Sequence, residues 1–291
     1  MPDKSIESLD IGAHLTIAGG IPAAMKMAHE IGATNFQFFP RNPRGGARRA
    51  ISQSEMADGR AARVEYGIRT VICHLPYTVN PASPDERISD FARMVVAEDV
   101  PFAAEMGADF VVLHPGAHMG DGPAAGIERV GRLFDNALAG YRGGARVLFE
   151  VMAGGGSVLG STVSDIAGLI QAAGGHEWLG TCFDSCHLLA AGWDVTTPAG
   201  IDTMLAAFDA AVGLSRVGCM HLNDSKTHKD SHKDRHELIG RGVIGESGLL
   251  ALLSNPFIRA LPLCLETPVD DIRDYDSEIR QVRRIAALAT V

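Results

Sequence analysis

Short segments rich in strand-forming residues recur along the chain, and each is followed by a longer stretch with helical spacing. The strand-like segments are Ile11–His14, Asn35–Phe39, Arg69–His74, Phe110–His114, Arg146–Glu150, Gly180–Asp184, Arg216–Leu222 and Leu263–Glu266. Between them, apolar residues return every three or four positions in the stretches Ile21–Ile31, Ile88–Met106, Arg129–Leu138, Val163–Ala173 and Ile201–Val212. Strands that alternate with helices form parallel sheets joined by right-handed crossovers.

Eight such units in 291 residues predict an α/β fold, a closed (β/α)8 TIM barrel. The alternative, an open doubly wound sheet, would usually carry a glycine-rich phosphate loop after its first strand. Gly12 and the Gly19–Gly20 pair do not form such a loop. Because no proline- or serine-rich linker divides the chain, we expect a single domain over residues 1–291, with residues 1–10 as a loose N-terminal extension.

Two local features add detail to this barrel. Pro101 lies inside one of the helical stretches, so we expect a kink or a break at Val100. Residues 271–291 carry no motif and are expected to form a helix that closes the barrel.

The composition narrows the class of protein. The formal net charge of −9 argues against a protein that grips nucleic acid through an overall basic surface. No apolar run approaches the roughly 20 residues of a membrane span. The first residues lack the basic and apolar regions of a signal peptide, and five cysteines in so long a chain do not indicate a disulfide scaffold. We therefore expect a soluble, reduced, cytoplasmic protein that does not bind membranes.

Six of the predicted strands end in a side chain that can bind a metal ion. These are His74, His114, Glu150, Asp184, His221 and Glu266, and successive members are 34 to 45 residues apart. Because one strand-helix unit has about this length, the six side chains are expected at the same level on the carboxyl face of the barrel. Barrels of this type carry their active sites on that face.

Three further candidate ligands follow in the loops, namely His187, Asp234 and His236. In an extended chain Asp234 and His236 project to the same side, because the side-chain period of a strand is two. Imidazole and carboxylate groups suit zinc or manganese, and nine ligands exceed what one ion can use. A single histidine or glutamate at a strand end is often only a hydrogen-bonded loop residue, but six in register favour a site with two or three ions.

The cysteines are expected to be structural. Cys182, Cys219 and Cys264 each lie two residues before a candidate ligand, so they point to the same inner side of the barrel, one layer deeper. We expect them to act there as small apolar core residues. Cys73 alternates outward toward the helices, and the C-x3-C spacing of Cys182 and Cys186 is only a weak metal signal.

Several longer motifs run through the chain in a fixed order. They are GAHLTIAGG at 12–20, FFPRNPRG at 38–45, CHLPY at 73–77, LHPGAH at 113–118, CFDSCH at 182–187, MHLNDSK at 220–226, DRHELIGRGVIG at 234–245 and LETP at 265–268. Through these motifs the chain, from residue 11 to about residue 270, resembles the endonuclease IV family of apurinic/apyrimidinic endonucleases.

The resemblance implies a barrel that binds three zinc ions, with manganese an alternative at one of them. Position by position, the ligand sets would be His74, His114 and Glu150 for the first ion, Glu150, Asp184, His221 and Glu266 for the second, and His187, Asp234 and His236 for the third. Glu150 and Glu266 would also be catalytic, because they would position and deprotonate the attacking water.

The activity implied by the resemblance is DNA repair. The enzyme would hydrolyse the phosphodiester bond 5′ to an abasic site in double-stranded DNA, leaving a 3′-hydroxyl and a 5′-deoxyribose phosphate. Members of the family also trim blocked 3′ ends. Metal ions deep in a barrel mouth cannot reach an intact stacked backbone, so the abasic nucleotide must be extruded. A monomer suits a protein that must clasp duplex DNA.

An arginine-rich loop, Pro40–Arg49, follows the second strand on the face that is predicted to carry the site. In the resemblance, Arg44 and Tyr77 match positions of side chains that insert into the base stack. The other side chains expected to contact DNA are Asn42, His14 and Lys226. Such a basic loop is otherwise usually only solvated, and its place on the carboxyl face is what favours contact with DNA.

The chain departs from the family's pattern in two places. Many members have Asn-Thr after the bridging glutamate, whereas this chain has Val151–Met152, so a polar partner of the ligands is expected to be missing. Thr78 stands where a larger apolar residue is common, which predicts a weaker wedge in the DNA. His118, in the LHPGAH motif, is expected beside the ligands without itself binding an ion.

Two other functions remain open at this level. A xylose-isomerase-like sugar isomerase or epimerase also places acidic residues and histidines on consecutive strand ends, around one or two divalent ions. Such an enzyme needs neither the third ligand set nor the arginine-rich loop. A catalytically inactive binder of DNA lesions would keep the groove, but the presence of both Glu150 and Glu266 argues against it. Three divalent ions would offset six of the nine net negative charges, so the acidic composition does not exclude a DNA substrate.

Overall fold

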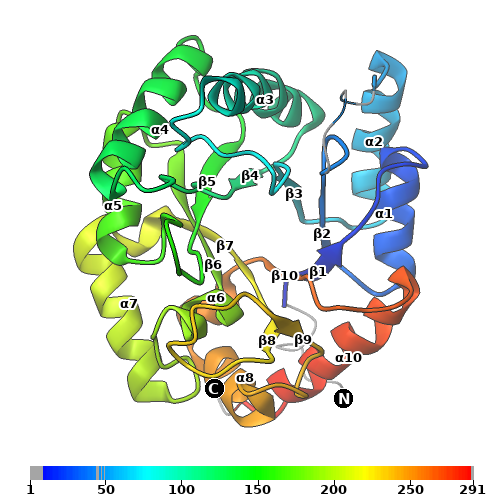
Figure 1. Cartoon of the computed structure of the whole chain (residues 1–291). Helices are drawn as coiled ribbons and strands as arrows, with labels where there is room; N and C mark the ends of the chain where they lie inside the picture. Colours follow the sequence, from blue (N-terminus) through cyan, green and yellow to red (C-terminus); the bar gives the residue numbers. More distant parts are fainter. Residues whose placement is uncertain (1–8, 44–45, 47, 49, 290–291) are drawn as a thin grey trace.

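Within the described residues, which are 9–43, 46, 48 and 50–289, the computed structural model is a closed barrel of eight parallel strands. The barrel strands are hydrogen-bonded in the order β1-β10-β7-β6-β5-β4-β3-β2 (Figure 1). Their bounds are β1 Ile11–His14, β2 Asn35–Phe38, β3 Thr70–His74, β4 Phe110–Leu113, β5 Arg146–Glu150, β6 Leu179–Asp184, β7 Val217–His221 and β10 Leu263–Leu265. The predicted (β/α)8 barrel is therefore confirmed.

Helices surround the barrel and cover its outer face (Figure 1). The helices are α1 Ile21–Glu30, α2 Gln53–Glu65, α3 Glu86–Met106, α4 Pro123–Ala137, α5 Val163–Ala172, α7 Pro198–Val212, α8 Gly245–Ser254, α9 Pro256–Ala260 and α10 Tyr275–Ala286, with short 3-10 turns η1 Leu214–Arg216 and η2 Ile272–Asp274. The short helix α6 Ser185–Ala190 lies inside this ring of helices, directly after β6 (Figure 1). The closing helix expected at the end of the chain is α10, while α2, α6, α8 and α9 are additional to the expected helices. Among the described helices, none combines the length and the low polarity needed to cross a lipid bilayer.

In helix α3, local sequence signals determine the ends, and packing against the core keeps the helix continuous. Asp85 begins it by accepting hydrogen bonds from the first-turn backbone, and Gly107 ends it in a left-handed conformation with φ of 84°. Of the kink or break expected at Val100, the break does not occur, because the helix continues through Pro101. Its buried face, which includes Val96 and Val100, packs in the core, and this packing outweighs the single backbone hydrogen bond that a proline removes.

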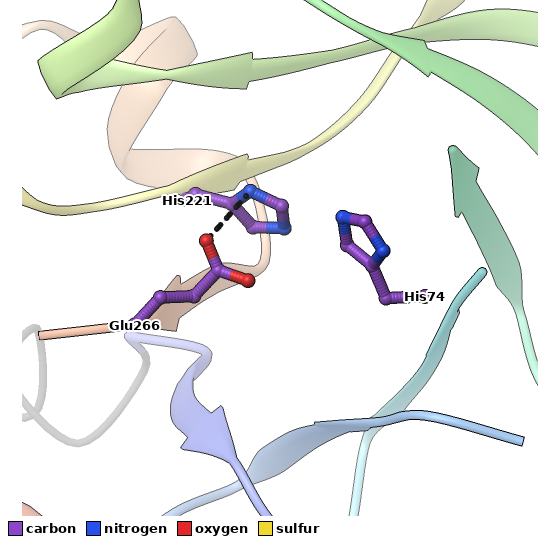
Figure 2. A group of neighbouring side chains, drawn as sticks. All are labelled: His74, His221 and Glu266. Carbon is purple, nitrogen blue, oxygen red and sulfur yellow. Dashed lines mark ion pairs between the residues drawn. The ribbon is translucent and has the colours of Figure 1, made fainter. Parts of the chain in front are cut away.

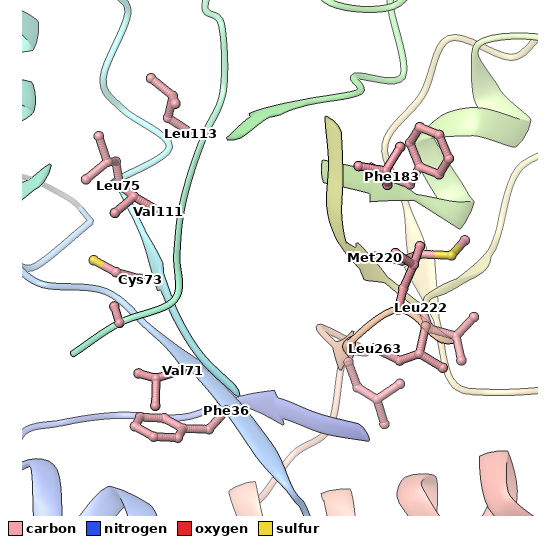
Figure 3. Close-up of a cluster of buried hydrophobic side chains, with 14 of the residues drawn as sticks. Phe36, Val71, Cys73, Leu75, Val111, Leu113, Phe183, Met220, Leu222 and Leu263 are labelled. Carbon is pink, nitrogen blue, oxygen red and sulfur yellow. The ribbon is translucent and has the colours of Figure 1, made fainter. Parts of the chain in front are cut away.

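Side chains along the strands alternate between two cores. Those that point outward pack against the helices, and several are drawn in Figure 3: Phe36, Val71, Cys73, Leu75, Val111, Leu113, Phe183, Met220, Leu222 and Leu263. Those that point inward form a separate apolar cluster: Ile72, Val112, Leu148, Cys182, Cys219 and Cys264. The expected core positions of Cys182, Cys219 and Cys264, and the outward position of Cys73, are confirmed.

The first described residues belong to the barrel. Leu9 is buried, and Asp10 accepts hydrogen bonds from Thr34 Oγ1 at 2.7 Å, Asn35 Nδ2 at 3.1 Å and Thr70 Oγ1 at 2.6 Å. These bonds tie the start of the chain to β2 and β3. Residues 1–8 lie outside the described residues, and the expected loose extension does not include residues 9 and 10.

A small antiparallel hairpin, made of β8 Asp224–Ser225 and β9 His236–Glu237, follows the end of β7. Asp224 is fully buried, and its carboxylate accepts hydrogen bonds from the backbone N–H groups of Gly242 at 2.9 Å and Ile244 at 3.0 Å. Gly242 has no room for a side chain, because a Cβ there would lie 2.4 Å from Asp224 Oδ1. This anchor fixes the hairpin that carries His236, a feature absent from the sequence-based expectation.

Candidate metal centre

One polar side chain from each barrel strand, or from the residue after it, contributes to a ring at the carboxyl end of the barrel. The members are His14, Gln37, His74, His114, Glu150, Asp184, His221 and Glu266. Six of these follow a member of the inner apolar cluster by two residues, so the strand period places them on the same inward side, one layer higher. The structure thus brings together all six candidate ligands that the sequence places at strand ends.

Glu150 lies in the middle of this ring and contacts four imidazoles of the described chain. Its Oε2 lies 3.1 Å from His74 Nε2 and 3.2 Å from His114 Nε2. Its Oε1 lies 3.0 Å from His221 Nδ1 and 3.2 Å from His187 Nδ1. With a side-chain exposure of 1%, this carboxylate can bridge two neighbouring ligand sets away from bulk water.

A second group gathers around His221, at the end of β7. His221 Nδ1 lies 3.3 Å from Glu266 Oε2 and 3.9 Å from Asp184 Oδ2. Figure 2 shows His221 and Glu266 pointing toward each other, with the ring of His74 facing them from β3. The rings of His74 and His221 are stacked with their centroids 5.7 Å apart. These donors therefore share one small volume.

The third group joins the short helix α6 to the hairpin. The carboxylate of Asp234 lies between two imidazoles, 3.2 Å from His187 Nε2 through Oδ2 and 3.2 Å from His236 Nε2 through Oδ1. Asp184 fixes His187 from the other side by capping α6, where its Oδ1 accepts a hydrogen bond from His187 N at 2.7 Å. The Asp-x-His spacing of the sequence indeed presents both side chains to one point.

These donor sets fit divalent ions of the zinc type. Ligand atoms that lie within 4.8 Å of one another occur in the groups His74–His114–Glu150, Glu150–Asp184–His221–Glu266 and His187–Asp234–His236, which are the three sets that the resemblance implies. Among the described residues, the buried Nε2 atoms of His187 and His236 make no well-directed hydrogen bond, although each lies 3.2 Å from the carboxylate of Asp234. A metal ion between them would use both nitrogens and the carboxylate as ligands.

Two further combinations, His74–His221–Glu266 and Asp184–Cys186–His236, also have ligand atoms within 4.8 Å. In the second, burial together with the charge of Asp184 raises the pKa of Cys186 to about 11, so this thiol is protonated at neutral pH in the metal-free protein.

The charges of the ring control one another's ionisation. Burial alone would raise the pKa of Glu150, but the neighbouring imidazoles of His221 and His114 hold it well below its ordinary value. Burial would lower the pKa of His221, but the carboxylates of Glu266 and Glu150 raise it to about 10. The centre is therefore built as alternating carboxylates and imidazoles whose charges stabilise each other in the absence of an ion.

The opposing effects of burial and neighbouring charge also determine the pKa values of the ligands on the hairpin. Burial would lower the pKa of His236, but the charge of Asp184 and the adjacent carboxylate of Asp234 raise it to about 9. Burial would raise the pKa of Asp234, but His187 and His236 hold it far below its ordinary value.

Zinc binding to the metal-free protein is expected to release protons at pH 7. The raised pKa values mean that His221 and His236 hold protons there, at about 10 and about 9, and an imidazole must lose its proton to bind an ion. In the metal-free protein, the raised pKa values of these two histidines also stabilise the folded state. This contribution is fully present below pH 6.5 or so, the ordinary pKa of histidine, and it is lost as the pH rises through about 9 and 10. Calorimetric zinc titrations in two buffers of different ionisation enthalpy measure the released protons, and a value of zero would contradict this electrostatic picture.

Two cavities lined by described residues open at this end of the barrel. One of about 430 Å³ is lined by all the candidate ligands except Asp184 and His221, together with Phe39, Tyr77 and Met152. The other, of about 670 Å³, is lined by His14, Asn42, Phe39 and mostly apolar neighbours. Phe39 separates the two, with its ring centroid 5.6 Å from that of His74 and 4.2 Å from that of His14.

The residues that are expected to contact DNA lie at different places around the mouth of the barrel. Tyr77 is half-exposed at the rim of the ligand cavity, and Lys226 is exposed at the start of the hairpin loop. His14 and Asn42 line the larger cavity. Arg44 lies outside the described residues.

The loop Pro40–Arg49 is not simply a basic, solvated segment. Arg41 is buried, and its guanidinium donates to Asp99 on α3 through Nε at 2.7 Å and Nη2 at 2.6 Å. Arg48 lies 3.5 Å from the same carboxylate and stacks on the ring of Phe102 at 3.9 Å. These two arginines anchor the loop to α3, so they are not available to bind phosphate.

Replacing Asp99 with asparagine is expected to destabilise the protein by about 3 kcal/mol, because Arg41 would be left buried with only the half-exposed Glu98 as a charged partner. Urea unfolding measures the change. Asp90→Asn on the same helix is the matched control, since its exposed pair with Arg93 is worth less than about 1 kcal/mol. An Asp99→Asn variant as stable as the control would refute the anchoring role.

The departures from the family's pattern have local explanations. The backbone carbonyl of Val151 accepts a hydrogen bond from His187 Nδ1 at 3.0 Å, so a polar partner for this ligand is present despite the apolar side chain. Thr78 donates through Oγ1 to the carbonyl of Pro43 at 2.8 Å and so links two loops of the mouth. The ring of His118 accepts hydrogen bonds from Gly120 N and Gly122 N before α4, and the expectation that it partners the ligands is wrong.

Two amides belong to the centre: Gln37 is not found by the search for metal-binding side chains, whereas Asn223 is expected from its place after the seventh strand to bind phosphate or to partner a ligand. Gln37 on β2 bonds to both His221 and Glu266. Asn223 donates through Nδ2 to Asp184 Oδ2 at 2.7 Å and accepts from Glu266 N at 2.8 Å through Oδ1. A signal for Gln37 exists in the sequence, since the alternation of Asn35–Phe38 places polar side chains on the inward side of a buried strand.

Comparison with known proteins agrees with the fold and with the motifs. A family model described as "Xylose isomerase-like TIM barrel" matches residues 25–287. A protein named "Probable endonuclease 4" from Moorella thermoacetica is 41% identical over 279 residues, covering 96% of this chain and 99% of its own length. A relative of the same name from Heliobacterium modesticaldum is 42% identical over 273 residues, covering 94% and 98% of the two chains.

Comparison with solved structures agrees with the sequence relatives. The crystal structure of endonuclease IV from Thermus thermophilus superposes with a TM-score of 0.83 at 34% identity, covering 96% of this chain and 98% of that one. A D-tagatose 3-epimerase-like protein has a TM-score of 0.67 at 17% identity, covering 95% and 98%, which shows the shared barrel fold alone. On the sequence relatives, the family model and the Thermus structure together, the chain belongs to the endonuclease IV family of xylose isomerase-like TIM barrels.

Proposed function

We propose that this protein is a zinc-dependent DNA-repair endonuclease that hydrolyses the phosphodiester bond 5′ to an abasic site, leaving a 3′-hydroxyl and a 5′-deoxyribose phosphate. The observation that carries the proposal is the set of nine donor residues, arranged in three adjoining groups; seven of the nine residues line one cavity of about 430 Å³. A phosphodiester carries negative charge and a poor leaving group, so its hydrolysis requires dense positive charge next to a proton acceptor.

Each of the three ligand sets described above would hold one ion, and Glu150 would be shared by two of the sets. Bound zinc supplies Lewis acidity, which lowers the pKa of a bound water toward 7 and neutralises charge on the phosphate. The protein supplies rigid positions for these ions: His74 Nδ1 bonds to the carbonyl of Leu75 at 2.6 Å, and His187 Nδ1 bonds to that of Val151.

Glu150 and Glu266 would also act as proton acceptors. Their carboxylates converge on His221, at 3.0 Å for Glu150 Oε1 and 3.3 Å for Glu266 Oε2. Neighbouring imidazoles hold the pKa of both carboxyl groups below the ordinary value, so both are ionised at neutral pH despite their burial. Each can therefore orient the attacking water and accept its proton.

The third ligand group would receive the leaving group. His187, Asp234 and His236 lie on α6 and the hairpin and line the same cavity as His74 and His114, so a phosphate in that cavity would contact both groups. An abasic nucleotide, which has no base, can be extruded into this space more cheaply than a normal one.

The rim would bind the flanking DNA. Tyr77 presents an exposed ring that can fill the space left in the base stack, and Lys226 presents a positive charge to the phosphates. We assign the same supporting roles to Asn42 and His14, which line the larger cavity, and to Arg44 by its place in the sequence. Trimming of blocked 3′ ends would use the same phosphate position.

A duplex oligonucleotide with one abasic-site analogue and a label on each end tests this proposal. The zinc-loaded protein is expected to cut the damaged strand once, on the 5′ side of the analogue, and to leave a 3′-hydroxyl that a DNA polymerase can extend. An undamaged duplex is the control. Absence of this cut, combined with one ion per chain and isomerisation of a ketose, would replace the proposal with the sugar isomerase or epimerase alternative.

A further inference from the structure

Gln37 is a fully buried amide that β2 contributes to the ring. Its Nε2 donates to Glu266 Oε1 at 2.6 Å, and its Oε1 lies 2.9 Å from His221 Nε2. The same Nε2 lies 3.0 Å from His14 Nδ1. Gln37 thus joins one imidazole and one carboxylate of a candidate ligand set to the larger cavity beside it.

The chemistry of these partners fixes how the amide is oriented. A carboxylate that binds an ion can only accept hydrogen bonds, so the NH2 group of Gln37 must face Glu266. The amide oxygen must then face His221, and because an amide oxygen only accepts, His221 Nε2 must carry a hydrogen and donate it. The orientation therefore follows from the bonding partners alone.

With its Nε2 protonated, His221 presents the lone pair of Nδ1. That atom faces the other members of its set, at 3.0 Å from Glu150 Oε1, 3.3 Å from Glu266 Oε2 and 3.9 Å from Asp184 Oδ2. We propose that Gln37 is a positioning residue, which selects Nδ1 of His221 as the metal-binding nitrogen and at the same time fixes the carboxylate of Glu266. This inference rests on the metal centre of the proposed function.

Gln37 extends this control to His14. One hydrogen of its NH2 group serves Glu266, and the other serves Nδ1 of His14, which must then be the acceptor nitrogen of that ring. The proton of the neutral His14 ring consequently lies on Nε2. A residue that lines the larger cavity thereby becomes an N–H donor in a fixed tautomer, suited to a phosphate or sugar oxygen.

The substitution Gln37→Leu tests the proposal, because leucine has a similar volume without a donor or an acceptor. Competition with a chromophoric chelator is expected to show about 10- to 100-fold weaker binding of the most weakly held zinc ion, the typical effect of removing a hydrogen-bond partner of a ligand. Asn35→Leu is the matched control: it removes an equally buried amide of β2, whose Nδ2 bonds to Asp10 and to the carbonyl of Leu263. We expect it to lower the unfolding temperature but to leave zinc affinity unchanged.

A second measurement does not depend on a variant that folds. In the zinc-loaded wild-type protein labelled with 15N-histidine, the Nε2 of His221 should give the shift of a protonated nitrogen and the Nδ1 that of a metal-bound one. The reverse pattern would overturn the proposal, as would equal losses of zinc affinity in Gln37→Leu and Asn35→Leu, or unchanged affinity in Gln37→Leu. Neither readout uses DNA, so a protein that behaves as expected here but does not cut abasic DNA would refute only the proposed function.

Discussion

Replacement of Glu150 with glutamine is expected to reduce incision of abasic DNA by at least about 100- to 1,000-fold and to lower the number of bound zinc ions. Glu150 touches four imidazoles from β3, β7, α6 and the end of β4, more than any other carboxylate of the described centre. Glutamine keeps the shape but removes the charge that both ligand sets share. Elemental analysis of the purified variant and a single-turnover incision assay measure the two effects.

The same variant should also be less stable without metal, by about 3–5 kcal/mol, because buried imidazoles would lose the charge that compensates them. Glu177→Gln, an exposed substitution of the same kind after α5, controls for the chemical change itself and is expected to behave as wild type. A Glu150→Gln protein with full zinc content and normal incision would show that Glu150 is not the bridging residue.

The second large effect is expected from Glu266→Gln, which should keep the fold and lose most of the incision activity. Glu266 lies at the mouth with 19% of its side chain exposed, and an amide oxygen there can still accept the hydrogen bond from Gln37 Nε2. What the variant lacks is the negative charge that accepts the proton of the water, so incision should fall by about 100- to 1,000-fold.

Thermal unfolding and the pH dependence of incision separate these contributions. The unfolding temperature of Glu266→Gln should stay within about 4 °C of wild type, in line with a change of about 1 kcal/mol. Asp270→Asn, an exposed substitution four residues later, is the control for nearby charge. Near-native turnover by Glu266→Gln would show that another group accepts the proton.

The sequence was sufficient to predict the barrel and the level of the candidate ligands, for a single physical reason. In a parallel strand the side chains alternate, so a residue two positions after an inner apolar residue, such as His221 after Cys219, faces the same side. When eight strands are in register, that spacing places the ligands of six different segments in one layer. The two-residue period of a strand and the length of one strand-helix unit can both be read from the amino-acid sequence.

Features that depend on contacts between distant segments were not predictable in this way. The pairing of Arg41 with Asp99 joins residues 58 positions apart, and the sequence offered only a basic loop. The hairpin anchored by Asp224 depends on backbone N–H groups of Gly242 and Ile244, which carry no sequence signal. The continuity of α3 through Pro101 also required knowledge of how well its buried face packs.

Within the site, the sequence search found residues mainly by their ability to bind metal and so missed Gln37, while Asn223 was expected only from its place at the end of a strand. Gln37 and Asn223 bind no ion in this arrangement, yet their hydrogen bonds orient Glu266 and its neighbours. Whether a side chain at a strand end holds an ion or holds a ligand depends on distances of a few tenths of an ångström, which only the folded arrangement determines.

A zinc titration of the metal-free protein, followed by incision of abasic duplex DNA at each step, tests the central claim most directly. Because nine donor residues form three adjoining sets, incision should be absent without metal and should reach its full rate only when three equivalents of zinc are bound. Full incision at one equivalent, or in the presence of excess chelator, would contradict the claim that this cluster is a multinuclear phosphodiester-cleaving centre.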